Sequence, residues 1–211
     1  MAYDLDEQEK LDALKAWWDR YGTLVAVLVF VVVAAIVGWR GWQWYQGHKA
    51  TQAMGYFEAL QSAAGHEGEE SVARLQAASA TLRDSFPNSG YTSRGVLVAA
   101  AALESQGKHD AAREQLDWLT NNGDDPALSA LARLRLAGIL LEQEQYDQAL
   151  AQVANPPASF DALYADRRGD ILFAQGKIED ARAAWQHALK AFGQDPIAQI
   201  VQLKIDAIAG A

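Results

Sequence analysis

Residues that could carry acid–base or metal chemistry are few and scattered in this chain. Four histidines are present, and none has a second histidine at i+4 or the carboxylate spacing that a metal ion needs. They are His48, His66, His109 and His187. Cysteine is absent, which excludes thiol chemistry, disulfides and zinc sites built on cysteine. No Gly-x-Ser-x-Gly nucleophile elbow occurs. The sequence therefore predicts a protein that is not an enzyme and needs no metal or other cofactor.

Four charged motifs have a physical interpretation. Gly107-Lys108 and Gly176-Lys177 could suggest phosphate loops, but neither has the upstream glycine or the following Ser/Thr of a P-loop. Both are better explained as turns between helices. The acidic cluster at 67–70 is typical of a solvated helix start. The segment Arg167-Arg168-Gly169-Asp170 predicts a buried Arg–Asp network, whose glycine allows close approach of the paired helix around Ala181.

Composition limits the classes of partner. The chain has 211 residues, with 27 Asp and Glu against 18 Lys and Arg, so its formal net charge is −9. This acidic balance argues against binding nucleic acid, which calls for a basic stripe. Half of the residues are hydrophobic, which argues against a disordered chain.

An uncharged segment near the N-terminus predicts a transmembrane helix. Gly22–Trp39 reads GTLVAVLVFVVVAAIVGW, and its 18 residues would form a helix of roughly 27 Å, close to the hydrocarbon thickness of a bilayer. A core helix of a small domain would carry some polar residues over this length. A cleaved signal peptide is disfavoured by the acidic N-terminal region and by the absence of a small-x-small cleavage site. We therefore expect a tail at 1–20, a span at 21–40 and a long juxtamembrane helix at 41–65.

Aromatic residues flank both ends of the span, as an interfacial belt does. Together with one arginine placed to snorkel toward the head groups, they are the expected interface anchors: Trp17, Trp18, Tyr21, Trp39, Arg40, Trp42, Trp44 and Tyr45. Three basic residues precede the span and two follow it closely, which slightly favours a cytoplasmic N-terminus. Small residues one turn apart, Gly22 with Ala26 and Ala34 with Gly38, would permit close helix packing in lipid; a lone anchor is the alternative.

The remainder, 66–211, predicts a helical repeat array. Similar turn segments start at residues 68, 107, 144 and 176, so they are 39, 37 and 32 residues apart, close to the period of about 34 residues in tetratricopeptide repeats. All five prolines, which cannot continue a helix, fall at unit ends. The third unit has Glu144 in place of the turn glycine, and Asn155-Pro156-Pro157 shortens its second helix. The predicted fold is all-α: one transmembrane helix followed by a tetratricopeptide-like α-solenoid.

The chain ends with an apolar segment at about 196–208 that predicts a capping helix. One stripe is expected to cover the last open repeat face; it consists of Ile197, Ile200, Val201, Ile205 and Ile208.

Stacked helical pairs offer a concave surface to a partner. We expect the inward side of the first helices to carry Leu97, Glu104, Leu134, Leu141, Asp166, Asp170 and Phe173. Their apolar members could dock an apolar segment, and their acids would favour a basic or amide-rich chain. The alternative is that several of them belong to the core between repeats.

Three stretches give the chain a resemblance to the YfgM family of bacterial inner-membrane proteins, ancillary subunits of the SecYEG translocon. The first is the acidic tail with its apolar span and Gly38-Trp39-Arg40. The second runs from Ala165-Asp166 through Arg168-Gly169-Asp170 and Gly176-Lys177 to Trp185. The third is Gln202-Leu203-Lys204-Ile205 near the C-terminus.

This resemblance implies a single-pass type II protein of the inner membrane, with a cytoplasmic N-terminus and a periplasmic tetratricopeptide-like domain. It implies association with SecYEG and with a membrane-anchored periplasmic chaperone of the PpiD type. It also implies a link to an envelope-stress response regulator, for which only the acidic segment Asp4–Asp12 is available. The alternatives are a binding module of another envelope machine, for outer-membrane or cell-wall assembly, and, more remotely, an enzyme acting on peptides.

Overall fold

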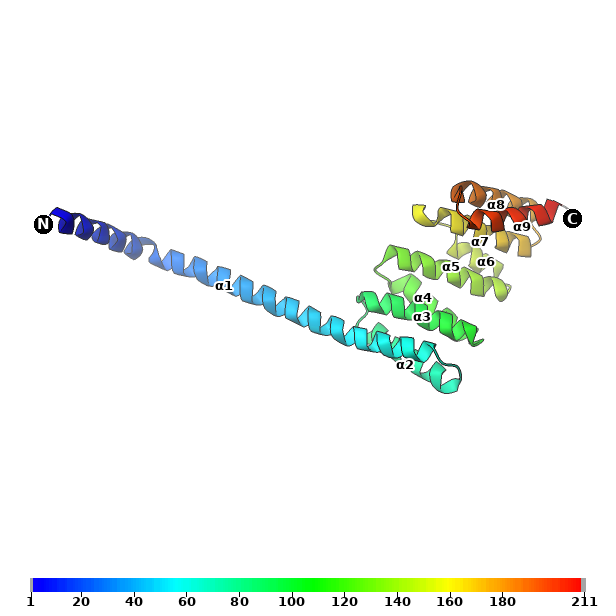
Figure 1. Cartoon of the computed structure of the whole chain (residues 1–211), viewed down its shortest axis with the longest axis horizontal. Helices are drawn as coiled ribbons and strands as arrows, with labels where there is room; N and C mark the ends of the chain where they lie inside the picture. The colour runs from blue at the N-terminus through cyan, green and yellow to red at the C-terminus, as the bar shows by residue number, and fades with distance from the viewer. Residues whose placement is uncertain (1, 210–211) are drawn as a thin grey trace. The chain divides into compact units, whose positions relative to one another are not determined.

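A computed structural model of the chain describes residues 2–209, with side chains described for residues 10–208. Most of the acidic segment Asp4–Asp12 therefore lies outside the described side chains. The described residues form helices and contain no strand, which confirms the predicted all-α class. The helices are α1 (Ala2–Ala64), α2 (Glu69–Ser85), α3 (Gly90–Ser105), α4 (His109–Asn122), α5 (Pro126–Glu142), α6 (Tyr146–Gln152), η1 (Ala158–Phe160), α7 (Asp161–Ala174), α8 (Ile178–Phe192) and α9 (Ile197–Ala209) (Figure 1).

The chain divides into two compact units, residues 1–50 and 51–211. In the first unit, α1 is continuous, so no helix end marks the expected boundaries after residues 20 and 40. No proline interrupts this segment, and a helix satisfies its own backbone hydrogen bonds in water and in lipid alike. Within the described residues, one helix is long and apolar enough to cross a membrane. Only 6% of its most apolar window is buried, whereas the core helix of a soluble protein would be covered.

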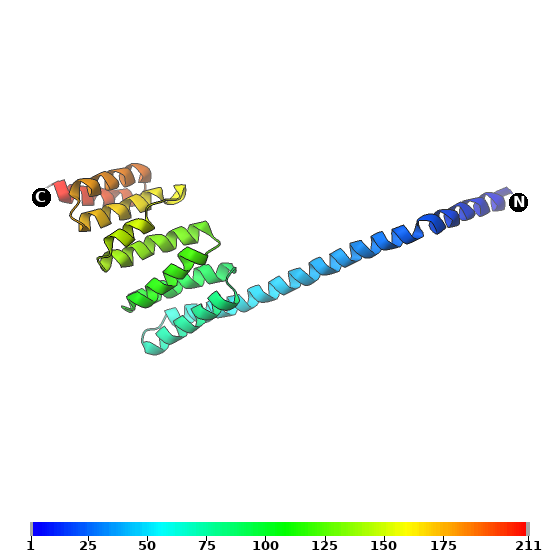
Figure 2. The same cartoon turned by 180° about the vertical axis from the view of Figure 1, so that it is seen from behind.

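The second unit is a stack of helical pairs, which Figures 1 and 2 show from opposite sides. The pairs are α3 with α4, α5 with α6 and α7 with α8, and α9 packs on α8. Neighbouring first helices also touch, α3 against α5 and α5 against α7. One apolar cluster runs through the stack from Ala53 to Ile171, and a second surrounds Trp185 near the C-terminal end. Each pair therefore buries its apolar face against the next pair, as a solenoid requires.

Local signals set the helix ends. Pro126 opens α5, where a missing N–H costs nothing. The Asp125 carboxylate oxygen accepts the N–H groups of Ala127 at 2.8 Å and Leu128 at 3.2 Å. The short α6 ends at Gln152, just before Asn155-Pro156-Pro157.

The three turns inside the repeat pairs share one backbone shape. Gly107, Glu144 and Gly176 adopt φ values of 71°, 57° and 76°. The next N–H in each turn donates to the carbonyl five residues back, at 2.8 Å (Lys108 to Leu103), 2.8 Å (Gln145 to Leu140) and 2.9 Å (Lys177 to Leu172). This is the Schellman arrangement that ends a helix in the left-handed region. Glu144 therefore takes the glycine conformation without being glycine.

The helix α9 covers the last repeat with Val201, Ile205 and Ile208 of the expected stripe. Val201 is fully buried and Ala198 nearly so, while Ile205 and Ile208 pack partly against the Trp185 cluster. Ile200 is 57% exposed, so its place in the buried stripe is wrong. Adjacent residues point about 100° apart around a helix, which turns Ile200 away when Val201 faces inward. Ile197, in the first turn, is 37% exposed.

Candidate partner-binding face

The repeated turns define which residues of the first helices occupy equivalent positions. Turn residues 107, 144 and 176 are separated by 37 and 32 positions, so Val98 of α3, Arg135 of α5 and Arg167 of α7 are equivalent. The same offsets relate Ala101, Gly138 and Asp170 one turn later. Since α3, α5 and α7 touch in sequence, equivalent side chains form rows across the stack.

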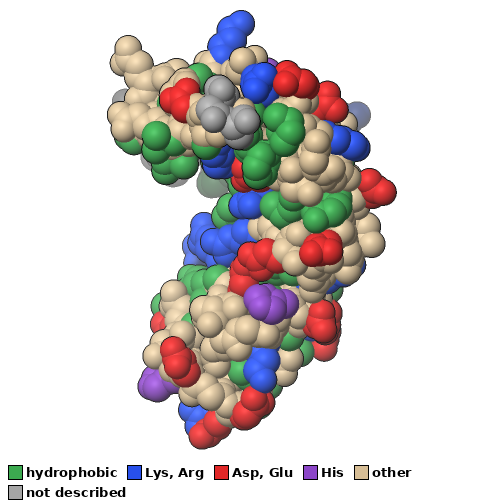
Figure 3. Space-filling model, turned by 90° about the vertical axis from the view of Figure 1, so that its right-hand side faces the viewer, with side chains coloured by type: hydrophobic (Ala, Val, Ile, Leu, Met, Phe, Trp, Pro, Cys, Tyr) green, Lys and Arg blue, Asp and Glu red, His purple; other side chains and the backbone are tan. Residues whose placement is uncertain are grey.

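Two arginines of one row lean back onto the preceding first helix. Arg135 Nη1 on α5 donates to the carbonyl oxygen of Leu97 on α3 at 3.1 Å. The Arg167 guanidinium on α7 lies 3.7 Å from the position that a Cβ would take on Gly138 of α5. Figure 3 shows Lys and Arg side chains gathered in the hollow of this unit. The inward surface is therefore more basic than the sequence suggested.

The two acids expected on this face are held inside the fold. Lys204 of α9 places Nζ 2.7 Å from Asp166 Oδ1 and 2.7 Å from Asp170 Oδ1. Trp185 Nε1 donates to Asp170 Oδ1 at 3.1 Å. Burial raises the pKa of Asp166, and the hydrogen bond from Lys204 opposes that rise. The two carboxylates therefore share one cationic partner inside the chain, which leaves less negative charge for a basic partner than the sequence predicts.

The expected Arg–Asp network differs in its partners. Arg167 Nη1 lies 4.0 Å from Asp170 Oδ2, so Lys204 is the closer cation. Arg168 instead donates to the carbonyl of Val153 at 2.7 Å, at the end of α6. A Cβ on Gly169 would lie 2.4 Å from the Trp185 ring. The close approach between α7 and α8 thus occurs at Trp185, one turn beyond Ala181.

The other expected face residues divide between core and surface. Leu97 is only 6% exposed and belongs to the main apolar cluster, so it has almost no surface to offer a partner. Leu134 and Leu141 are half-buried against the same cluster, and Glu104 is half-buried. Phe173 is 46% exposed, and its ring centroid lies 5.7 Å from that of Trp185.

Comparison with known proteins identifies the family. Residues 15–210 match the model of a family described as a tetratricopeptide repeat-like domain. The ancillary SecYEG translocon subunit of Neisseria gonorrhoeae is 31% identical, over 99% of this chain and all of the relative. The proteins of the same name from Haemophilus influenzae and Escherichia coli are 26% and 25% identical, over 98% and 95% of this chain and 99% and 96% of theirs. This chain belongs to the YfgM family of ancillary SecYEG translocon subunits.

In this YfgM-family chain, the residues flanking the apolar span are exposed aromatics. Trp44 is 73% exposed, and the other expected aromatic anchors and Arg40 are exposed as well. Trp39 and Trp42 have ring centroids 5.7 Å apart, and Lys49 Nζ lies 5.2 Å from the Tyr45 ring centroid. Such rings with an adjacent cation suit the boundary between hydrocarbon and water. The exposed apolar helix fits a membrane-anchored protein.

The small residues of the span are not equivalent. At Gly22 a Cβ would lie 3.1 Å from the Trp18 indole, so the Trp18 ring covers this glycine and fills the expected notch. At Gly38 nothing lies within 4 Å, and Ala26 and Ala34 are exposed. The helix surface is therefore open at Ala34 and Gly38 and covered by the Trp18 ring at Gly22.

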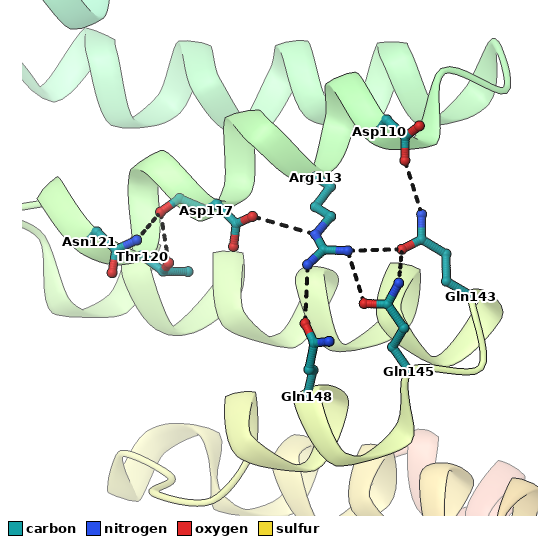
Figure 4. Close-up of polar contacts among 8 residues, drawn as sticks. All are labelled: Asp110, Arg113, Asp117, Thr120, Asn121, Gln143, Gln145 and Gln148. Atoms are coloured by element: carbon teal, nitrogen blue, oxygen red, sulfur yellow. Dashed lines mark hydrogen bonds and ion pairs between the residues drawn. The ribbon is translucent and has the colours of Figure 1, made fainter.

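A glutamine-rich network that the sequence analysis missed joins the repeats of this YfgM-family chain (Figure 4). Arg113 of α4 donates to the amide oxygens of Gln143 at 3.3 Å, Gln145 at 3.0 Å and Gln148 at 3.1 Å. Asp117 Oδ2 lies 3.6 Å from Arg113 Nε. One arginine thus links α4 to the next turn and fixes the register of two repeats. In the sequence, three glutamines close together around one turn were the feature that could have indicated this network.

Among residues 10–208, no cluster of His, Asp or Glu could hold a metal ion.

Proposed function

We propose that this chain is a non-enzymatic, single-span scaffold of the Sec translocon. Its repeat unit would hold membrane-anchored periplasmic chaperones of the PpiD type near proteins emerging from SecYEG. The observation that carries the proposal is the match, over nearly the full length of both chains, to relatives named ancillary SecYEG translocon subunits. The match includes the span as well as the repeats, so both parts of the relatives have counterparts here.

The proposed orientation places the N-terminus in the cytoplasm and the repeat unit in the periplasm, as a type II protein of the bacterial inner membrane. Lys10, Lys15 and Arg20 precede the span, against Arg40 and Lys49 after it. Positive charge favours the cytoplasmic side. In this orientation the acidic segment Asp4–Asp12 is the part available to a cytoplasmic response regulator of envelope stress.

Crosslinking followed by purification in a neutral detergent tests the proposed partners. We expect SecYEG and a membrane-anchored chaperone to co-purify with the full chain. A variant whose residues 22–39 are replaced by eighteen leucines keeps the anchor and separates contacts of the span from those of the repeats. Recovery of neither partner would contradict the proposal, and recovery of outer-membrane or cell-wall assembly proteins would favour the alternative envelope machine. If alanine substitution of the histidines and inward acids abolished the protein's activity in cells while both partners still co-purified, the result would support an enzyme acting on peptides instead.

A further inference from the structure

The arginines of the inward face stand out against the charge of their unit. Residues 51–211 contain 21 Asp and Glu and 13 Lys and Arg. Within the described side chains, no carboxylate lies within 4 Å of the guanidinium of Arg135. Arg167 has one, Asp170 at 4.0 Å, which Lys204 contacts more closely at 2.7 Å.

Two other arginines of the repeat unit have a structural role, because each donates to a backbone carbonyl near the end of a helix. Arg133 donates to the carbonyl of Thr120 near the end of α4 at 3.1 Å. Arg168 does the same for Val153 at the end of α6. Both guanidiniums satisfy carbonyls that a helix end leaves open. Arg135 instead donates to the carbonyl of Leu97 within α3, and the Arg167 side chain, 34% exposed, lies beside Gly138, so neither guanidinium satisfies a helix end.

The spacing of Arg135 and Arg167 suits an extended polypeptide. They hold equivalent positions on neighbouring first helices, and each leans back by one helix, so their separation follows that of the helices, about 8–10 Å. A chain in the extended polyproline II conformation advances about 3.1 Å per residue with three residues per turn, so carboxylates three residues apart lie on one side and match this spacing. A guanidinium fork binds a carboxylate through two parallel N–H donors, with better geometry than an ammonium group.

We propose that Arg135 and Arg167 bind an acidic, extended segment of a partner polypeptide with carboxylates about three residues apart. This inference rests on the proposed function, since it takes the inward face as the place where a partner is held. It replaces the basic or amide-rich partner that the sequence suggested, because Asp166 and Asp170 are occupied by Lys204.

Fluorescence anisotropy with the full chain in neutral micelles tests the proposal. The probe is a fluorescein-labelled twelve-residue Gly-Ser peptide with glutamate at every third position; a matched peptide carries glutamine instead. We expect the glutamate peptide to bind at least tenfold more tightly, and its affinity to fall as salt screens the charges. Arg135→Gln and Arg167→Gln should each weaken binding several-fold. Arg74→Gln removes the same charge from an exposed site on α2 and should leave binding unchanged.

A second variant separates lost binding from lost folding. Gly138 has room for a Cβ, since the nearest atom to that position, on Arg167, is 3.7 Å away. Gly138→Asp would set a carboxylate against Arg167, and we expect it to abolish peptide binding while the melting temperature is preserved. Equal binding of the two peptides, unchanged binding by Gly138→Asp, or equal loss in Arg74→Gln would overturn the proposal. So would binding to phosphatidylglycerol vesicles in place of the peptide through the same arginines. Peptide binding without co-purification of SecYEG would instead retain this inference and reject the translocon assignment.

Discussion

At the scale of single residues, Glu144 occupies a backbone position that favours glycine. Its φ of 57° matches Gly107 and Gly176 in the equivalent turns. A side chain in the left-handed region costs about 1–2 kcal/mol relative to glycine, partly offset by the greater freedom of an unfolded glycine. We expect Glu144→Gly to raise the free energy of unfolding by about 1 kcal/mol, measured by thermal unfolding of the repeat unit in micelles.

The reverse change is the control for this prediction. Gly176 has the same conformation, and nothing lies within 4 Å of the position that a Cβ would take there, so Gly176→Ala adds strain without a clash. It should lower stability by a similar amount. A Glu144→Gly protein that is less stable than the natural chain would show that the glutamate side chain contributes more than its backbone costs.

The residue scale also shows where sequence reasoning stops. The turns could be found because glycine, lysine and acid recur there at nearly regular intervals. The pairing of Asp166 and Asp170 could not, because their partner Lys204 stands 38 and 34 positions away on α9. Two carboxylates that look unpaired in the sequence share one lysine, which the packing of α9 brings to them.

At the scale of elements, α9 stabilises the last repeat through one face. Val201 is fully buried in the Trp185 cluster, whereas Leu203 on another side of the helix is 68% exposed. A buried carboxylate without a partner is strongly unfavourable. We expect Val201→Asp to lower the free energy of unfolding by about 3 kcal/mol or more and to open α8 and α9 to limited proteolysis.

Leu203→Asp is the matched control, because it adds the same charge to the same helix two residues away. It should change stability by less than about 0.5 kcal/mol. If both substitutions destabilised the chain equally, α9 would be held through its charge rather than through its apolar face. The sequence predicted this helix from its apolar stripe but misplaced Ile200. Periodicity shows which residues share a side of α9, but it does not show how wide a strip of that side the neighbouring helix covers.

At the scale of the whole molecule, sidedness decides which partners can reach the inward arginines. The chain has no cysteine, so a single introduced cysteine reports its own location without background. Ala13 precedes the span and Gln194 lies between α8 and α9, and both are exposed. With a cytoplasmic N-terminus, a membrane-impermeant maleimide should label Gln194→Cys in intact spheroplasts and Ala13→Cys only after lysis.

The other possible labelling patterns would each contradict the proposed orientation in a different way. Labelling of Ala13→Cys alone would reverse the orientation, and the repeat unit would then meet cytoplasmic partners instead of periplasmic chaperones. Labelling of both in intact spheroplasts would show that the exposed apolar helix does not cross the bilayer. Lys10, Lys15 and Arg20 against Arg40 and Lys49 give a bias of one charge, and the rule acts through charges within about 15–20 residues of the span. Moving Lys15 to the other side of the span would leave two charges before it and three after it, so the labelling pattern should shift toward the opposite orientation.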